Sequence, residues 1–158
     1  MKYIVCVTQS PDTAELPKVT VDQVESGNQG LELITNPWDE YAIEEGLRLK
    51  EKHGGSVLAI TVGPAGAEGA LKSAVAMGVP KGVRVWDDTF AGSDALAIGR
   101  ILAAAVRKED DYDVVLTGKT TVDGNGALVP VALASALGAA LLSRVAKIVA
   151  IGDGKITV

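Results

Sequence analysis

The segment from residue 118 to residue 126 carries the residue types that could bind a phosphate. Its sequence, Gly-Lys-Thr-Thr-Val-Asp-Gly-Asn-Gly, follows a short apolar stretch and precedes an apolar helical pattern. Glycines let backbone N–H groups approach an anion, and the N-terminus of a following helix attracts negative charge. Lys119 adds a cation, and Thr120 and Thr121 add hydroxyl donors. An ordinary tight turn explains Asp-Gly-Asn-Gly equally well, and Asp123 could coordinate a cation, bond a ribose or brace the loop.

Other reactive side chains are few and isolated. The loop has neither the spacing of a Walker A motif nor a preceding G-x-G-x-x-G. Cys6 and His53 are the only cysteine and histidine, which argues against an intrachain disulfide and a Cys/His metal site. Cys6 lies in an apolar stretch and is expected to be a buried, inert thiol. No set of nucleophile, base and orienting group indicates an acyl- or phosphoryl-transfer enzyme.

Composition argues against several further classes of protein. The chain has 158 residues, 47% of them apolar and 4% aromatic, with a formal net charge of -5. No cluster of Lys and Arg suggests nucleic-acid binding. The longest apolar tract, 127–142, is interrupted by Pro130, Ser135 and Gly138 and is too short for a membrane span. The apolar start is too short for a signal segment, so we expect a cytoplasmic protein.

Strand-like and helix-like stretches alternate along the chain. Asn36-Pro37-Trp38-Asp39 predicts a helix start, with Asn36 as the cap, Pro37 at the first position and Asp39 near the positive end of the helix. The expected strands are 3–8, 56–62, 83–86, 112–117 and 145–151, and the expected helices are 37–52, 67–77, one from 93 and 127–137. This order predicts an α/β fold of the Rossmann-like, adenine-nucleotide-binding type: an open, mostly parallel sheet of about five strands with helices on both faces.

Two hairpins are also predicted. Residues 18–24 could add a hairpin edge, and Gly152-Asp153-Gly154-Lys155 reads as a tight hairpin turn. The last three residues, 156–158, resemble a strand that has just begun. We therefore expect residues 1–158 to form a single domain that is truncated at its C-terminus; a short, complete edge strand is the alternative.

Three loops are expected at the carboxyl edge of the sheet, where open α/β sheets bind ligands. They are 8–12 after the first strand, 62–64 after the second, and 118–126 after the fourth.

Four segments, in order, resemble one known family. Residues 36–50, which begin Asn-Pro-Trp-Asp-Glu-Tyr, are similar to the stretch beginning Asn-Pro-Phe-Asp-Glu-Tyr in electron-transfer flavoprotein β subunits. Residues 74–78 resemble the family's Ala-Leu-Ala-Met-Gly, 91–94 its Gly-Ser-Asp, and 118–124 its Gly-Lys-Gln-Ala-Ile-Asp-Gly. The resemblance extends from Met1 to about Gly138.

This resemblance implies a β subunit that binds AMP, or a second FAD in electron-bifurcating members. It also implies pairing with an α subunit, so that a shared FAD shuttles electrons from dehydrogenases to a quinone-linked acceptor, with the chain as a carrier component and not a catalyst. Positions that match the family's nucleotide pocket are Cys6, Asn36, Pro37, Trp38, Asp39, Val62, Gly118, Lys119, Thr120, Thr121, Val122, Asp123, Gly124, Asn125, Gly126, Ala127, Leu128 and Val129. Backbone atoms of Cys6 and Val62 could bond an adenine edge.

The chain departs from the family pattern in three ways. Thr8 stands where the family commonly has Lys, and residues 126–130 replace a more polar Thr-Gly-Gln-Val-Gly type of segment. The family's rear third is absent, so this chain is not expected to transfer electrons by itself. Two other hypotheses fit the same fold: a stand-alone ATP- or AMP-binding stress or signalling module, and an enzyme related to adenine-nucleotide hydrolases, for which the sequence offers no catalytic set.

Overall fold

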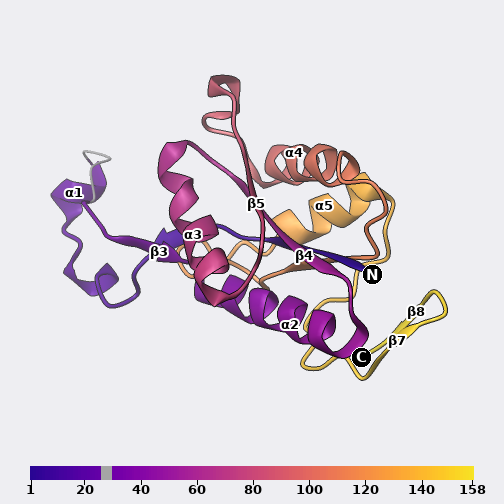
Figure 1. Cartoon of the computed structure of the whole chain (residues 1–158). Coiled ribbons are helices and arrows are strands. Elements are labelled where there is room, and N and C mark those ends of the chain that lie inside the picture. The colour runs from indigo at the N-terminus through magenta and orange to yellow at the C-terminus, as the bar shows by residue number, and fades with distance from the viewer. Residues whose placement is uncertain (26–29) are drawn as a thin grey trace.

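Four parallel strands form the central sheet of the protein, whose computed structural model describes residues 1–25 and 30–158 (Figure 1). The strands are β1 (Lys2–Cys6), β4 (Ser56–Val62), β5 (Gly82–Val85) and β6 (Val114–Thr117), in the order β5-β4-β1-β6. Tyr3 of β1 pairs with Val57 of β4 on one side and Val114 of β6 on the other. The predicted fold class is therefore confirmed, with four strands in the sheet.

Helices cover both faces of this sheet. In the view of Figure 1, α2 lies below the strands, and α4 and α5 lie above them. The four helices are α2 (Pro37–His53) and α3 (Glu68–Met77) on one face and α4 (Ala95–Arg107) and α5 (Val129–Leu137) on the other. Because side chains alternate along a strand, Tyr3 and Val5 of β1 pack towards α2 and α3, whereas Ile4 and Cys6 pack towards α4 and α5.

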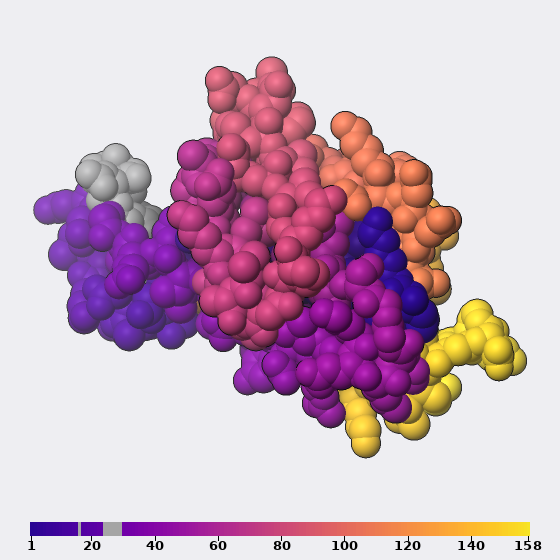
Figure 2. Space-filling view, in the orientation of Figure 1, coloured from indigo at the N-terminus to yellow at the C-terminus, as the bar shows by residue number. Residues whose placement is uncertain are grey.

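The predicted fifth strand does not join the sheet. Within 145–151 only the last two residues are extended, as part of β7 (Ala150–Gly152), which pairs antiparallel with β8 (Lys155–Thr157) alone. Ile148 and Ile151 pack against the core beside α2, and a spacing of three does not suit a strand with one buried face. The predicted turn at 152–155 does connect β7 and β8, and this hairpin stands off the body of the molecule (Figure 2).

The predicted hairpin edge at 18–24 is wrong. A 3-10 helix at Leu16–Lys18 and a short helix α1 (Val21–Glu25) occupy this region. The two-stranded ribbon forms instead from its flanks, β2 (Gln9–Pro11) and β3 (Leu33–Thr35), which pair antiparallel. Thr20 Oγ1 accepts the Gln23 N–H at 3.3 Å and the Gln23 side chain accepts the Thr20 N–H, a reciprocal cap that favours a helix start over a strand.

Close packing fixes α5 against α4. A Cβ atom added at Gly99 of α4 would lie 2.4 Å from Ala132 Cβ and 2.8 Å from the backbone nitrogen of Leu133 in α5. Only glycine lets the two helices approach this closely. The contact therefore sets the position of α5, whose first turn follows the loop after β6.

Candidate functional site

The sheet changes winding direction between β1 and β6. The chain that leaves β1 continues, through the β2–β3 ribbon, to α2 on one face, while the chain that leaves β6 continues to α5 on the other face. The carboxyl ends of these neighbouring strands consequently diverge. In open α/β sheets such a switch point is where ligands bind, and the loop from Gly118 onwards lies there, as predicted.

Asp39, in the first turn of α2, links the two diverging loops. Its Oδ2 accepts the backbone N–H of Thr8 at 2.8 Å, and its Oδ1 accepts the backbone N–H of Gly118 at 3.1 Å. The residue is 6% exposed. Hydrogen bonds from two N–H donors to one buried carboxylate are strong. They hold the ends of β1 and β6 together at the start of α2.

Asn36 provides a second link at the same place. Its side-chain amide donates to the carbonyl of Thr120 at 2.9 Å, and its backbone N–H donates to the carbonyl of Thr8 at 2.9 Å. Its side chain therefore makes no cap bond to α2, which corrects the predicted capping role, although Pro37 does occupy the first turn. Asn36 is fully buried and its Oδ1 has no hydrogen-bond donor among the described residues. Such an orphaned acceptor suits a hydrogen-bond donor supplied by a ligand or a water.

Burial shifts two pKa values at this junction. Burial raises the pKa of Asp39 to about 6, against the lowering effect of hydrogen bonds from Thr8, Asn36 and Gly118. Burial, and then the charge of Asp39, raises the pKa of the Cys6 thiol to about 12. The thiol therefore stays protonated at neutral pH, as expected of an inert, buried cysteine.

Gly118 is the tightest point of the site. A Cβ atom there would lie 2.2 Å from Asp39 Oδ1 and 2.8 Å from the backbone carbonyl carbon of Trp38. No larger residue fits without moving α2 or the loop. From the sequence, the glycines of this loop were expected to let the backbone approach a phosphate. In the structure, Gly118 is required because the loop packs closely against the start of α2.

Beyond Gly118 the loop turns outward. Thr120 is buried, Thr121 and Val122 are half-buried, and Gly124 to Leu128 are exposed. The carboxylate of Asp123 accepts the N–H of Gly124 at 2.7 Å, a contact that braces the loop. Asn125 and Ala127 both have positive φ, at 47° and 49°, which is uncommon for residues with a side chain.

Three apolar residues of the predicted site, Cys6, Val62 and Val129, belong to one core cluster. Cys6, at the end of β1, is buried in the core cluster between the sheet and the helices α4 and α5. Val62, at the end of β4, and Val129, in the first turn of α5, are half-buried against the same cluster. All three therefore belong to the face of the sheet that α4 and α5 cover.

Trp38 and Lys119 form an outward-facing pair. The ammonium of Lys119 lies 5.2 Å from the centre of the Trp38 ring, and Trp38 is 39% exposed. The sequence placed Trp38 at the start of a helix, and the family resemblance placed it in the nucleotide pocket, but neither predicted this contact. It also missed the backbone of Thr8 and the fully buried Thr61, whose Oγ1 has no partner among the described residues; a lone threonine in the apolar run Val-Leu-Ala-Ile-Thr-Val was the available signal.

The remaining features of the described chain lie away from the predicted site residues. Among residues 1–25 and 30–158, no three His, Cys, Asp or Glu side chains are grouped so that they could hold a metal ion. None of the described helices has the length and apolar character to cross a membrane. A hollow of about 450 Å³ is lined by α2 residues between Glu45 and Lys52 and by 147–149, and another by residues of α3 and β5; no predicted site residue lines either one.

The sheet and the helices on its two faces define a Rossmann-like α/β fold, with the loops after β1 and β6 diverging at its switch point. Residues 27–158 match the family model described as the electron transfer flavoprotein domain, and the chain belongs to this family. The resemblance drawn from its sequence segments is thereby confirmed.

Curated relatives agree with this membership. The chain is 41% identical to Protein FixA of Azotobacter vinelandii, in an alignment covering 98% of the chain and 56% of the relative. It is 39% identical to the electron transfer flavoprotein subunit beta of Clostridium acetobutylicum (97% and 58%) and 35% identical to that of Bacillus subtilis (94% and 57%). The chain thus spans somewhat more than half the length of these relatives.

Proposed function

We propose that this chain is the nucleotide-binding part of an electron-transfer flavoprotein β-type subunit. It holds AMP, or a second FAD, at the switch point between β1 and β6. It pairs with an α-type subunit that carries FAD, and the assembly shuttles electrons from dehydrogenases. The chain acts as a carrier component and not as a catalyst. Family membership supports the β-type role.

The observation that carries the proposed site is the double fastening of the loop after β6 to the start of α2. Asp39 and Asn36 hold Gly118 and Thr120 in fixed positions through hydrogen bonds of 3.1 Å and 2.9 Å. A site that binds a ligand tightly needs loops that are ordered before the ligand arrives, because ordering them on binding costs affinity. The unpaired Asn36 Oδ1 adds an acceptor at the same place.

The residues at this edge have separable roles in the proposal. In the proposal, backbone atoms of Cys6 and Val62 bond the adenine edge, and the half-buried side chains of Val62 and Val129 pack on the base. Backbone N–H groups of the loop and of the first turn of α5 receive the phosphate, with the positive end of α5 favouring its charge. Lys119 supplies the cation. When FAD is the ligand it supplies electron transfer; the chain's own residues bind and orient it.

The experiment that tests the proposal is to purify the chain, denature it and identify any released small molecule by mass. Released AMP supports the β-type role, and released FAD supports the bifurcating type. ATP would instead favour a stand-alone signalling module. A chain that carries none of the three, and binds none of them on titration, would overturn the proposed site.

A variant pair locates the site. The double substitution Lys119→Ala with Asp123→Ala should weaken nucleotide binding by roughly 2–4 kcal/mol if both side chains contact the ligand. The matched control is Lys72→Ala with Glu44→Ala, which removes the same charges from exposed positions of α3 and α2. Equal affinity of both double variants and the wild type would move the site elsewhere.

A further inference from the structure

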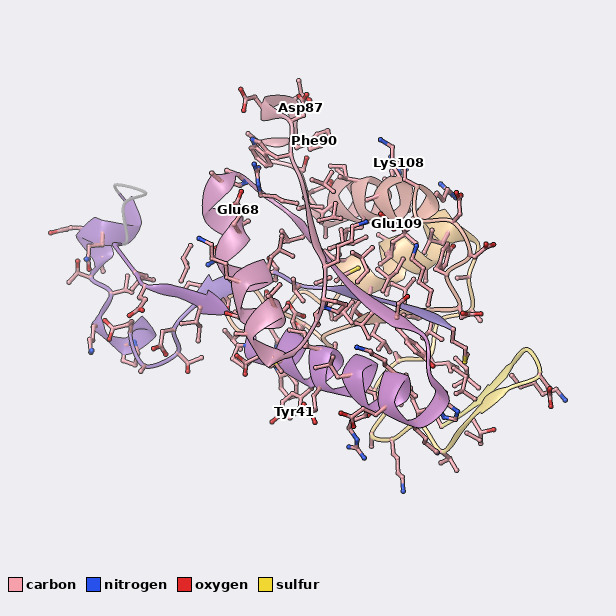
Figure 3. All side chains as sticks on the ribbon, in the orientation of Figure 1. Tyr41, Glu68, Asp87, Phe90, Lys108 and Glu109 are labelled. Atoms are coloured by element: carbon pink, nitrogen blue, oxygen red, sulfur yellow. The ribbon has the colours of Figure 1, made fainter. Side chains whose placement is uncertain are left out.

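Lys119 and Trp38 meet at the surface beside the proposed nucleotide site. The Lys119 ammonium lies 5.2 Å from the Trp38 ring centre, and the ring in turn lies 5.9 Å from that of Tyr41. Tyr41 is 71% exposed, on the outer side of α2 (Figure 3). Through the side chains of Lys119 and Trp38, the loop after β6 contacts the start of α2.

The backbone on both sides of the pair is fixed. Trp38 lies between Asn36 and Asp39, and Lys119 lies between Gly118 and Thr120, and these flanking residues are the ones joined by the two buried hydrogen bonds. The position of each Cα atom is therefore set by the fastening. The flexible stem of Lys119 is the part that can carry its charge to another partner.

No carboxylate neutralises this ammonium. The ion pairs among residues 1–25 and 30–158 do not include Lys119. Asp123, the nearest acid along the loop, has its carboxylate bonded to the N–H of Gly124. Within the part of the chain that the structure describes, the Lys119 ammonium therefore has no ion-pair partner and lies against the face of an exposed indole.

An exposed ammonium gains less from an aromatic face than from a charge-assisted hydrogen bond to a phosphate oxygen. We propose that Lys119 exchanges these partners: its ammonium leaves the Trp38 ring and transfers to the nucleotide phosphate when a ligand binds. Trp38 is then a positioning residue that keeps the cation beside the site, and its indole senses whether a phosphate is present. This inference rests on the proposed function.

The exchange predicts a change in Trp38 emission that depends on the phosphate of the ligand and not on its adenosine part. In a Trp86→Phe background, Trp38 is the only tryptophan left in the chain, so its emission reports on this contact. Titration with AMP should change the emission, while adenosine should bind with little change. In a Lys119→Met variant of the same background, the AMP-dependent change should disappear, and the preference for AMP over adenosine should fall about tenfold. Lys72→Met, on α3, is the matched control and should leave both quantities unchanged.

Calorimetric titration with both ligands, run in parallel, separates the outcomes. If AMP binds while the Trp38 emission is unmoved, the exchange is wrong and the nucleotide site stands. If Lys119→Met weakens AMP and adenosine equally, Lys119 supports the loop and does not contact the phosphate, which also overturns the exchange. If neither ligand binds the wild-type chain, the proposed site and this inference both fall.

Discussion

The carboxylate of Asp39 accepts the backbone N–H of Gly118 at 3.1 Å, although 79 residues separate the two in the sequence. The same carboxylate accepts the N–H of Thr8 at 2.8 Å. One buried side chain at the start of α2 therefore decides how the ends of β1 and β6 lie relative to each other. Because the proposed ligand binds between those ends, its site depends on packing that leaves no room for a side chain at position 118.

We expect Gly118→Ala to lower the free energy of unfolding by about 3 kcal/mol, since the new methyl group would lie 2.2 Å from Asp39 Oδ1. Relief of the clash requires the loop to leave α2, so nucleotide affinity should fall as well. Chemical denaturation and ligand titration check the two effects. Gly126→Ala is the matched control in the same loop: no atom lies within 4 Å of the added methyl group, and stability should change by less than about 0.5 kcal/mol. Equal stability of the two variants would contradict the tight contact.

The raised pKa of Asp39 gives stability a pH dependence of defined sign. Its folded-state pKa is raised from 3.8 to about 6, chiefly by burial, so the folded chain binds this proton more readily than the unfolded chain does. The contribution to stability is therefore fully present below pH 4 and is lost as the pH rises through 6, by about 3 kcal/mol in total. The unfolding free energy of the wild type relative to that of Asp39→Asn should therefore fall by about 2.4 kcal/mol between pH 4 and pH 7.

A difference that grows over the same pH range would mean that the hydrogen bonds to Asp39 outweigh its burial. The comparison cancels the titration of all other carboxylates, which are common to both proteins. Should Asp39→Asn fail to fold, a carboxyl chemical-shift titration of the wild type supplies the same information. The expected midpoint is near pH 6, and a midpoint below 4 would contradict the prediction.

Local patterns in the sequence were sufficient for most of the fold. The β-branched runs predicted β1, β4, β5 and β6, and Pro37 with Asp39 predicted the start of α2. The run at 145–151 predicted a strand for the same reason and failed. Its pairing depended on a free sheet edge and on which core the residues Ile148 and Ile151 would join, neither of which is visible in a local pattern.

The position of the loop after β6 was predictable from the sequence, but the contacts that hold it were not. The sequence correctly placed the Gly118 loop at the carboxyl edge beside the start of α2. It gave Asp39 a role with the helix dipole and Asn36 a role as a cap, because both are local effects. Their actual partners, Gly118 and Thr120, lie 79 and 84 residues away, so only the folded chain brings these groups into contact.

Ala127 is held in a left-handed conformation, with φ of 49°, just before α5. An alanine pays about 1–2 kcal/mol for this backbone geometry, whereas glycine adopts it freely. Glycine also increases the conformational freedom of the unfolded chain, and this effect cancels about 0.4–1 kcal/mol of the stability gained by relieving the strain. Ala127→Gly should therefore raise the unfolding free energy by about 0.5 kcal/mol. Ala104→Gly, on the exposed side of α4, should lower it by about 1 kcal/mol. A loss of similar size in both variants would show that residue 127 is unstrained.

The contact between Gly99 and α5 should influence ligand binding from a distance. Gly99→Ala places a methyl group 2.4 Å from Ala132 Cβ, so α5 must shift, and we expect stability to fall by about 2 kcal/mol. Because the first turn of α5 receives the phosphate in our proposal, AMP affinity should fall too, while adenosine affinity should change less. Gly66→Ala, where no atom lies within 4 Å of the added methyl group, is the control for both measurements. A destabilised Gly99→Ala chain that binds AMP with wild-type affinity would show that the phosphate does not depend on the position of α5.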